Sequence, residues 1–114
     1  GLGGFMSFDI IPRNKEAGIL GKPNGFQNAF FVETPIAKLI DCEYTERGTI
    51  RYEHDGYIGD AWFTEEEALE MHRILLEYVE TDEYKNHRYF SERQNQMESM
   101  LEFLPVCGGF KMEW

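Results

Sequence analysis

The strongest constraint on the fold is a capped amphipathic segment in the second half of the chain. Thr64 and Glu67 have the spacing of a capping box, in which each side chain bonds the other residue's backbone N–H at a helix start. Apolar side chains then recur at helical spacing. The main stripe is Ala68, Met71, Leu75 and Val79, broadened by Leu69, His72, Ile74, Leu76 and Tyr78. The pattern predicts a helix over residues 65–80.

A second helix and a final strand are predicted near the C-terminus. Ser91 and Gln94 have the spacing of another capping box, and Pro105 limits the helix that follows. Its inner face is formed by Met97, Met100, Leu101 and Leu104. After Gly108-Gly109, residues 110–114 alternate apolar and polar, which predicts a strand with Phe110, Met112 and Trp114 on one face.

The N-terminal part gives shorter and weaker signals. Residues 7–11 are predicted to form a short strand, because Phe8, Ile10 and Ile11 are strand formers, and Pro12 ends it. Residues 13–25 contain several glycines and turn residues and are predicted to form a loop. Residues 26–33 fit a helix or a strand equally well. Thr34 followed by Pro35 predicts the start of a short helix that carries Ile36, Leu39 and Ile40.

The middle of the chain is expected to be extended. Residues 49–52 alternate, Asp55-Gly56 is typical of a hairpin turn, and Gly59-Asp60 predicts a second turn before a strand at 61–63. Together with the two helices, this predicts an α+β fold in which two long helices pack on one face of a small antiparallel sheet.

Length and composition are typical of a single domain. The chain has 114 residues, and we expect a domain over residues 6–114, preceded by a Gly-rich leader at 1–5 that was added for expression. No apolar run approaches the roughly 18 residues of a membrane-spanning helix. Cys42 and Cys107 lie far apart in apolar surroundings with no CxxC motif. Reduced core thiols and a cytoplasmic location are therefore expected, with one long-range disulfide as the alternative.

Several segments of the C-terminal half resemble a group of small uncharacterised bacterial and phage proteins. The resemblance rests on Asp55-Gly56, on the capped helix that begins Thr64-Glu65-Glu66-Glu67-Ala68, on the Glu102-Phe103-Leu104 segment, and on the ending from Gly108-Gly109-Phe110 to Trp114. These motifs are caps, a core stripe and a terminal strand. The resemblance therefore implies a fold and carries over no activity, cofactor or catalytic residue.

Negative charge is concentrated in one part of the chain. The sequence has 21 acidic and 11 basic residues and a net charge of −10. Residues 60–83 hold nine acidic residues and one basic residue, a net of −8, and the other residues hold twelve and ten, a net of −2. This balance is unfavourable for direct contact with nucleic acids or anionic membranes, because phosphate contacts require lysine and arginine. It is typical either of a solvated helix face or of a docking surface for a basic partner.

The motifs of catalysis and cofactor binding are weak or missing. No HExxH, HxH or GxSxG pattern is present, and the spacing of Gly18, Gly21 and Gly25 matches neither nucleotide-binding fingerprint. His54, Asp55 and Asp60 could gather near the Gly18–Gly25 loop, which is the basis of an alternative hypothesis of a metal-dependent or small-molecule enzyme. That loop, with Arg13, Lys15 and Lys22, is also the most basic stretch and could contact a partner.

The leading hypothesis is a non-enzymatic, immunity- or inhibitor-like protein that docks a basic protein through the acidic helix, with no metal or cofactor. The acidic residues expected to bind the partner are Glu65, Glu66, Glu70, Glu77, Glu80, Asp82 and Glu83. The aromatic residues expected to supply contact area are Trp62, Tyr78, Tyr84 and Tyr89. A third hypothesis is self-association through an exposed sheet edge.

Overall fold

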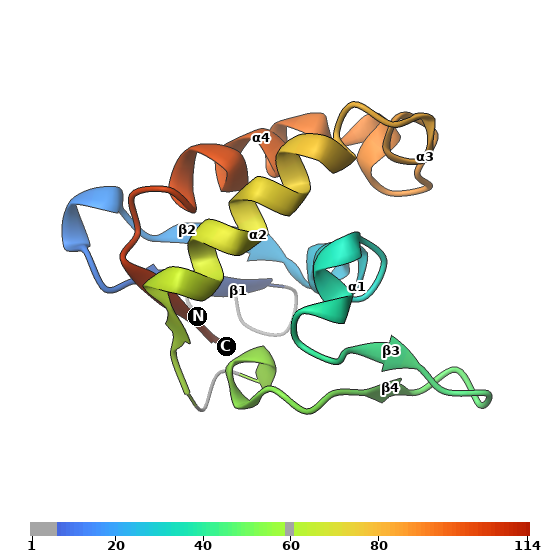
Figure 1. The fold of residues 1–114 in the computed structure, drawn as a ribbon, viewed down its shortest axis with the longest axis horizontal. Coiled ribbons are helices and arrows are strands. Elements are labelled where there is room, and N and C mark those ends of the chain that lie inside the picture. The colour runs from blue at the N-terminus through green and yellow to red at the C-terminus, as the bar shows by residue number, and fades with distance from the viewer. Residues whose placement is uncertain (1–6, 59–60) are drawn as a thin grey trace.

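A computed structural model describes residues 7–58 and 61–114, which form an α+β fold (Figure 1). Within these residues, four antiparallel strands form the main sheet in the order β2-β1-β6-β5, and β3 and β4 form a separate hairpin. The main strands are β1 (Ser7–Pro12), β2 (Leu20–Pro23), β5 (Phe63–Thr64) and β6 (Gly109–Glu113), and the hairpin strands are β3 (Glu43–Tyr44) and β4 (Ile50–Arg51). The α-helices are α1 (Asn24–Phe31), α2 (Glu65–Tyr78), α3 (Asp82–Lys85) and α4 (Gln94–Phe103). Short 3-10 helices are η2 (Lys15–Ala17), η3 (Pro35–Lys38), η4 (Asp55–Ile58) and η5 (Phe90–Glu92).

The main sheet has one face in the core and one face away from it. Along β1, Phe8, Ile10 and Pro12 are buried and alternate with residues that are partly exposed. The register places Ile10 opposite Met112 and Pro12 opposite Phe110, so β6 adds its own buried side chains to the same face. The alternation predicted for residues 110–114 is therefore confirmed, and Trp114, although 45% exposed, stacks on Phe8 at 5.3 Å between ring centroids.

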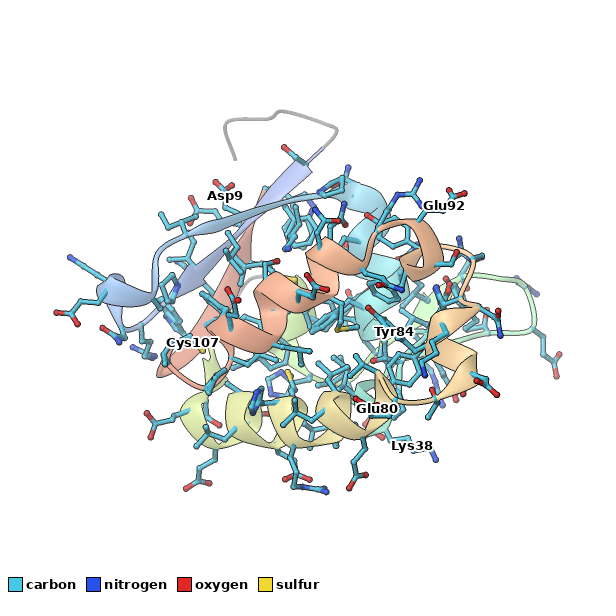
Figure 2. The ribbon with its side chains drawn as sticks, turned by 90° about the horizontal axis from the view of Figure 1, so that it is seen from above. Asp9, Lys38, Glu80, Tyr84, Glu92 and Cys107 are labelled. Carbon is cyan, nitrogen blue, oxygen red and sulfur yellow. The ribbon has the colours of Figure 1, made fainter. Side chains whose placement is uncertain are left out.

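Three helices cover the core face, where two were predicted. Buried side chains of α1, α2 and α4 all belong to the same apolar cluster as those of the sheet. Figures 1 and 2 show α2 and α4 lying side by side, with α1 beyond one end of β2. The additional helix is α1, which resolves the open question at residues 26–33, and it buries Phe26, Phe30 and Phe31. Full burial of such a side chain contributes about 1.5–3 kcal/mol, so α1 is a principal part of the core.

Two predicted features of the N-terminal part have different outcomes. The Thr34-Pro35 signal is confirmed, because Thr34 Oγ1 accepts a hydrogen bond from Ile36 N at the start of η3. The predicted loop over residues 13–25 is wrong, because this segment holds η2, β2 and the first turn of α1. Strand β2 forms because it pairs with β1, whose residue Phe8 lies opposite Lys22.

Two further predictions are wrong. Asp55-Gly56 lies in η4 and makes no hairpin turn, while the hairpin closes earlier, where Thr45 N donates to Thr49 O at 2.7 Å. Helix α4 begins after Arg93 without a side-chain cap, since Ser91 belongs to η5 and does not cap α4. The predicted Gly59-Asp60 turn and the leader at 1–5 lie outside the described residues.

Candidate functional site

Helix α2 begins at the predicted capping box. Thr64 Oγ1 accepts a hydrogen bond from Glu67 N at 3.0 Å, and Glu67 Oε1 accepts one from Thr64 N at 2.9 Å. The other oxygen of the same carboxylate, Oε2, lies 2.5 Å from His54 Nε2. The first turn is therefore fixed both by its own cap and by a side chain from the segment before η4.

The outer face of α2 combines acidic and apolar side chains. Ala68, Met71, Leu75 and Tyr78 are buried against the core. On the opposite side, Leu69 is 44% exposed and Leu76 is 47% exposed. These leucines are seven residues apart, or about 10 Å along the helix axis. We define the acidic face as the solvent-facing side of α2 and of the turn that follows it, formed by Glu66, Leu69, Glu70, Leu76, Glu77 and Glu80.

One arginine partly compensates the charge of the acidic face. Arg73 makes two hydrogen bonds to the Glu70 carboxylate, one of them from Nε at 3.1 Å, and its NH1 lies 3.9 Å from Glu77 Oε1. The hydrogen bond from Arg73 lowers the pKa of Glu70, so this carboxylate stays ionised. Among the described residues, Glu66 and Glu80 form no ion pair, and they leave a negative surface at both ends of α2.

The aromatic residues predicted beside this helix are not available to a partner. Tyr78, Tyr84 and Tyr89 are 3%, 6% and 9% exposed and belong to the core cluster. Burial, followed by the carboxylates of Glu83 and Glu33, raises the pKa of Tyr78 to about 12. Trp62 lies elsewhere, beneath the Arg13 guanidinium at 4.3 Å from the ring centroid. The interface prediction is therefore wrong for the tyrosines, because the turns around α3 fold them inward.

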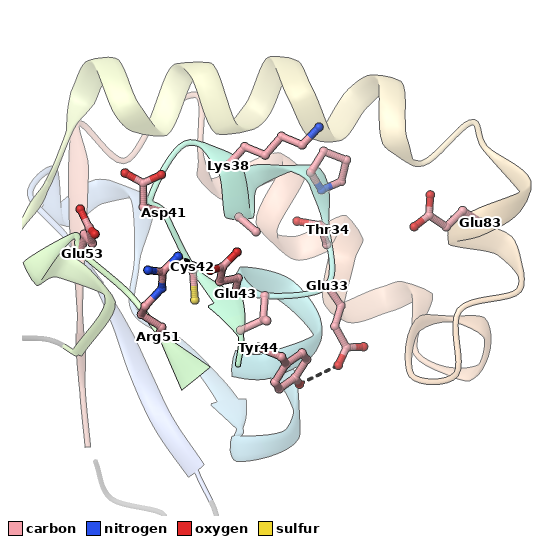
Figure 3. A pocket seen from close by; sticks show the side chains of 13 residues that line it. Glu33, Thr34, Lys38, Asp41, Cys42, Glu43, Tyr44, Arg51, Glu53 and Glu83 are labelled. Atoms are coloured by element: carbon pink, nitrogen blue, oxygen red, sulfur yellow. Dashed lines mark hydrogen bonds and ion pairs between the residues drawn. The ribbon is translucent and has the colours of Figure 1, made fainter. Parts of the chain in front are cut away.

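A hollow of about 670 Å³ lies next to α2, between η3, the β3–β4 hairpin and α3 (Figure 3). Its rim includes the carboxylates of Glu33, Asp41, Glu43, Glu53 and Glu83 and two cations, Lys38 and Arg51. Glu43 is paired with Arg51. Within the described part of the chain, Asp41, Glu53 and Glu83 form no ion pair, so the hollow has an excess of negative charge. We call it the η3 hollow.

Glu33 on the rim of the η3 hollow is held by three partners that the sequence did not indicate. Its carboxylate accepts a hydrogen bond from the Tyr44 hydroxyl at 2.9 Å, lies 2.5 Å from the Arg88 guanidinium, and lies 2.9 Å from His87 Nε2. Desolvation acts to raise the pKa of Glu33, but the hydrogen bonds from Arg88 and Tyr44 outweigh it and lower the pKa. His87 Nδ1 accepts from Tyr89 N at 3.0 Å. The cluster therefore joins the segment after α1 to the segment between α3 and η5.

Of the residues proposed for an enzyme, His54 is the one whose side chain the structure describes. His54 uses both ring nitrogens, since Nδ1 accepts from Gly56 N at 2.9 Å and Nε2 faces Glu67. Its ring also stacks on Phe63 at 4.4 Å between centroids. Asp60 lies outside the described residues, and the side chain of Asp55 is not described either. Across residues 7–58 and 61–114, no group of three His, Cys, Asp or Glu side chains could hold a metal ion.

The two cysteines are buried and unpaired. Burial raises the pKa of the Cys42 thiol to about 11, although a hydrogen bond with Tyr57 acts in the opposite direction, and burial likewise raises the pKa of Cys107. Both thiols are therefore protonated at neutral pH and are poor nucleophiles. Their core position agrees with the sequence prediction.

The comparisons with known proteins add no relative. No protein-family model, curated protein or solved structure matches the chain. The resemblance to small bacterial and phage proteins stays a prediction. In the part of the chain that the structure describes, no helix has the length and apolar content needed to cross a lipid bilayer.

Proposed function

We propose that this chain is a non-enzymatic cytoplasmic binding protein that docks a basic protein partner on the acidic face of α2. The observation that carries the proposal is the pair of exposed leucines, Leu69 and Leu76, set among glutamates on a rigidly capped helix. Apolar side chains two turns apart on one helix are the usual anchors of a helix that occupies a groove. The surrounding glutamates favour a groove with a basic rim and accelerate its association.

The η3 hollow supports the choice of a basic partner. It lies against the flank of α2, since η3 packs on this helix. The carboxylates of Asp41, Glu53 and Glu83 on its rim have no cationic partner within the described residues. A lysine or arginine side chain of a partner that covers α2 can reach them. Two buried, unpaired cysteines support a reducing compartment for the protein.

The experiment compares two triple variants with the same net charge. Glu66→Lys/Glu77→Lys/Glu80→Lys changes the acidic face, whereas Glu16→Lys/Glu46→Lys/Glu92→Lys changes three exposed acids elsewhere. Each triple variant takes the net charge from −10 to −4. Each is used as bait in the native host extract at low salt, and the rate of association with any recovered protein is then measured against ionic strength.

We expect wild type and the scattered variant to recover the same basic protein, and the acidic-face variant to associate at least tenfold more slowly. Leu69→Ser/Leu76→Ser should increase the rate of dissociation while leaving the fold intact, because both side chains are exposed. Equal recovery by the two charge variants, with equal salt dependence, would show that the acidic face does not bind the partner.

The other two hypotheses receive less support. The enzyme hypothesis depends on His54, whose two nitrogens are already engaged by Gly56 and Glu67. Self-association through a sheet edge would use β2 or β5, which are four and two residues long. Short edge strands, one of which ends in Pro23, are features that oppose edge-to-edge pairing.

A further inference from the structure

The face of the main sheet turned away from the helices has a pocket whose charged side chains are positive, in contrast to the negative side chains of the acidic face. The pocket has a volume of about 550 Å³. Its lining is Ile11, Pro12, Arg13, Lys15, Ile19 and Trp62. Four of these side chains are apolar, two are cationic and none is acidic, in a chain whose net charge is −10. Ile19 is 63% exposed, the largest exposure of any large hydrophobic side chain in the described residues.

One cation of the pocket, Arg13, and a neighbouring cation outside its lining, Lys111, lie against the ring of Trp62. The Arg13 guanidinium lies 4.3 Å and the Lys111 ammonium 5.2 Å from the ring centroid of Trp62. Lys111 is also 3.8 Å from Glu113, which offsets part of its charge. Within residues 7–58 and 61–114, neither Arg13 nor Lys15 forms an ion pair. Their donors are therefore free to bind an anion.

The backbone that carries these cations is fixed before any ligand arrives. Arg13 N donates to Gly109 O at 2.9 Å, and Asn14 N donates to Cys107 O at 2.8 Å. The Asn14 side chain donates from Nδ2 to Val106 O at 2.9 Å, and its oxygen caps η2 by accepting from Glu16 N at 3.2 Å. Such preorganisation reduces the entropy that binding must overcome.

We propose that this pocket binds a small organic anion with a single negative charge and a flat or apolar body, such as an aromatic carboxylate. Small-molecule pockets typically have volumes of about 300–1,000 Å³, mostly apolar walls and a few polar groups that fix orientation. Here Ile11, Ile19 and Trp62 provide the walls, and Arg13 with Lys15 provides the polar groups.

The net charge of the whole chain limits how much negative charge the ligand can carry. A net charge of −10 repels a polyanion such as a nucleic acid in proportion to the polyanion's charge, whereas it repels a monoanion only weakly. The pocket takes none of its lining residues from α2. Binding here is therefore independent of the function proposed for the acidic face.

The test uses phenylacetate as the probe and the indole N–H signal of Trp62 in nitrogen-15 NMR as the reporter. The sequence has two tryptophans, so Trp114→Phe assigns the signal. We expect saturable shifts of the Trp62 signal with phenylacetate, about tenfold weaker binding in Arg13→Gln, and unchanged binding in Lys38→Gln, which removes an exposed cation from the η3 hollow. Phenylacetamide and acetate separate the contributions of the charge and of the aromatic body, and each should bind more weakly.

Any of four results would overturn the proposal. One is the absence of saturable shifts at Trp62 in the folded wild type. The second is binding of phenylacetamide as tight as that of phenylacetate, and the third is binding that Arg13→Gln leaves unchanged. The fourth is tighter binding of a short single-stranded oligothymidylate at Trp62, which would identify the face as a nucleic-acid surface.

Discussion

Lys22 is a buried cation at a position where the sequence predicted an exposed loop. It is 5% exposed, and its Nζ donates to Gln96 O at 3.0 Å, donates to Ser99 Oγ, and lies 5.0 Å from the ring centroid of Phe26. Desolvation lowers the pKa of Lys22 from 10.5 to about 8. The prediction that Lys22 contacts a partner is therefore wrong, since its ammonium group ties β2 to α4.

The lowered pKa of Lys22 predicts a pH dependence of the free energy of unfolding, which Lys22→Met should remove. Between pH 8 and 10.5 the folded chain has lost the lysine proton while the unfolded chain retains it, so raising the pH favours folding. Relative to Lys22→Met, the free energy of unfolding of wild type should rise over this range by up to about 3 kcal/mol. Urea unfolding at several pH values measures the difference. Parallel pH profiles would show that Lys22 titrates normally.

The junction of β5 and β6 depends on a glycine that no other residue can replace without strain. Gly109 has φ of +106°, and a Cβ there would lie 2.7 Å from Phe63 O. Gly109→Ala should lower the free energy of unfolding by about 3 kcal/mol, because backbone strain and a steric clash add together. Gly18 is the matched control, since its φ is +80° and its Cβ would meet no atom within 4 Å. Equal losses in thermal or urea unfolding would show that the clash relaxes freely.

The predictability of an element depends on how local its determinants are. The helix at Thr64 and the short helix at Thr34 were predicted because cap and helix are adjacent in the sequence. Strand β2 was missed because its partner is β1 and the contacts of Lys22 lie 74 and 77 residues away. The cap predicted at Ser91 was wrong because hydrogen bonds around His87 continue the preceding turn into η5.

At the scale of the molecule, charge could be assigned from the sequence but exposure could not. The concentration of acids in residues 60–83 is a property of composition alone, so it was visible at once. Leu69 and Leu76 were placed in the apolar stripe of the helix, and the structure exposes both because α2 is covered on one side only. The pocket around Trp62 was missed because it unites β1, η2 and the segment before β5.

The uneven charge predicts a salt dependence of folding that belongs to α2. Like charges one helical turn apart destabilise a helix by about 0.2–0.5 kcal/mol per pair, and salt screens them over about 10 Å at 0.1 M. The free energy of unfolding of wild type should therefore rise with sodium chloride at neutral pH. The slope of the free energy of unfolding against salt concentration should be smaller in Glu66→Lys/Glu77→Lys/Glu80→Lys than in wild type. It should fall less in Glu16→Lys/Glu46→Lys/Glu92→Lys, although both variants carry a net charge of −4. Equal slopes in the two variants would show that the repulsion depends on the net charge and not on its concentration on α2. In that case α2 would hold no local charge repulsion for a basic partner to relieve.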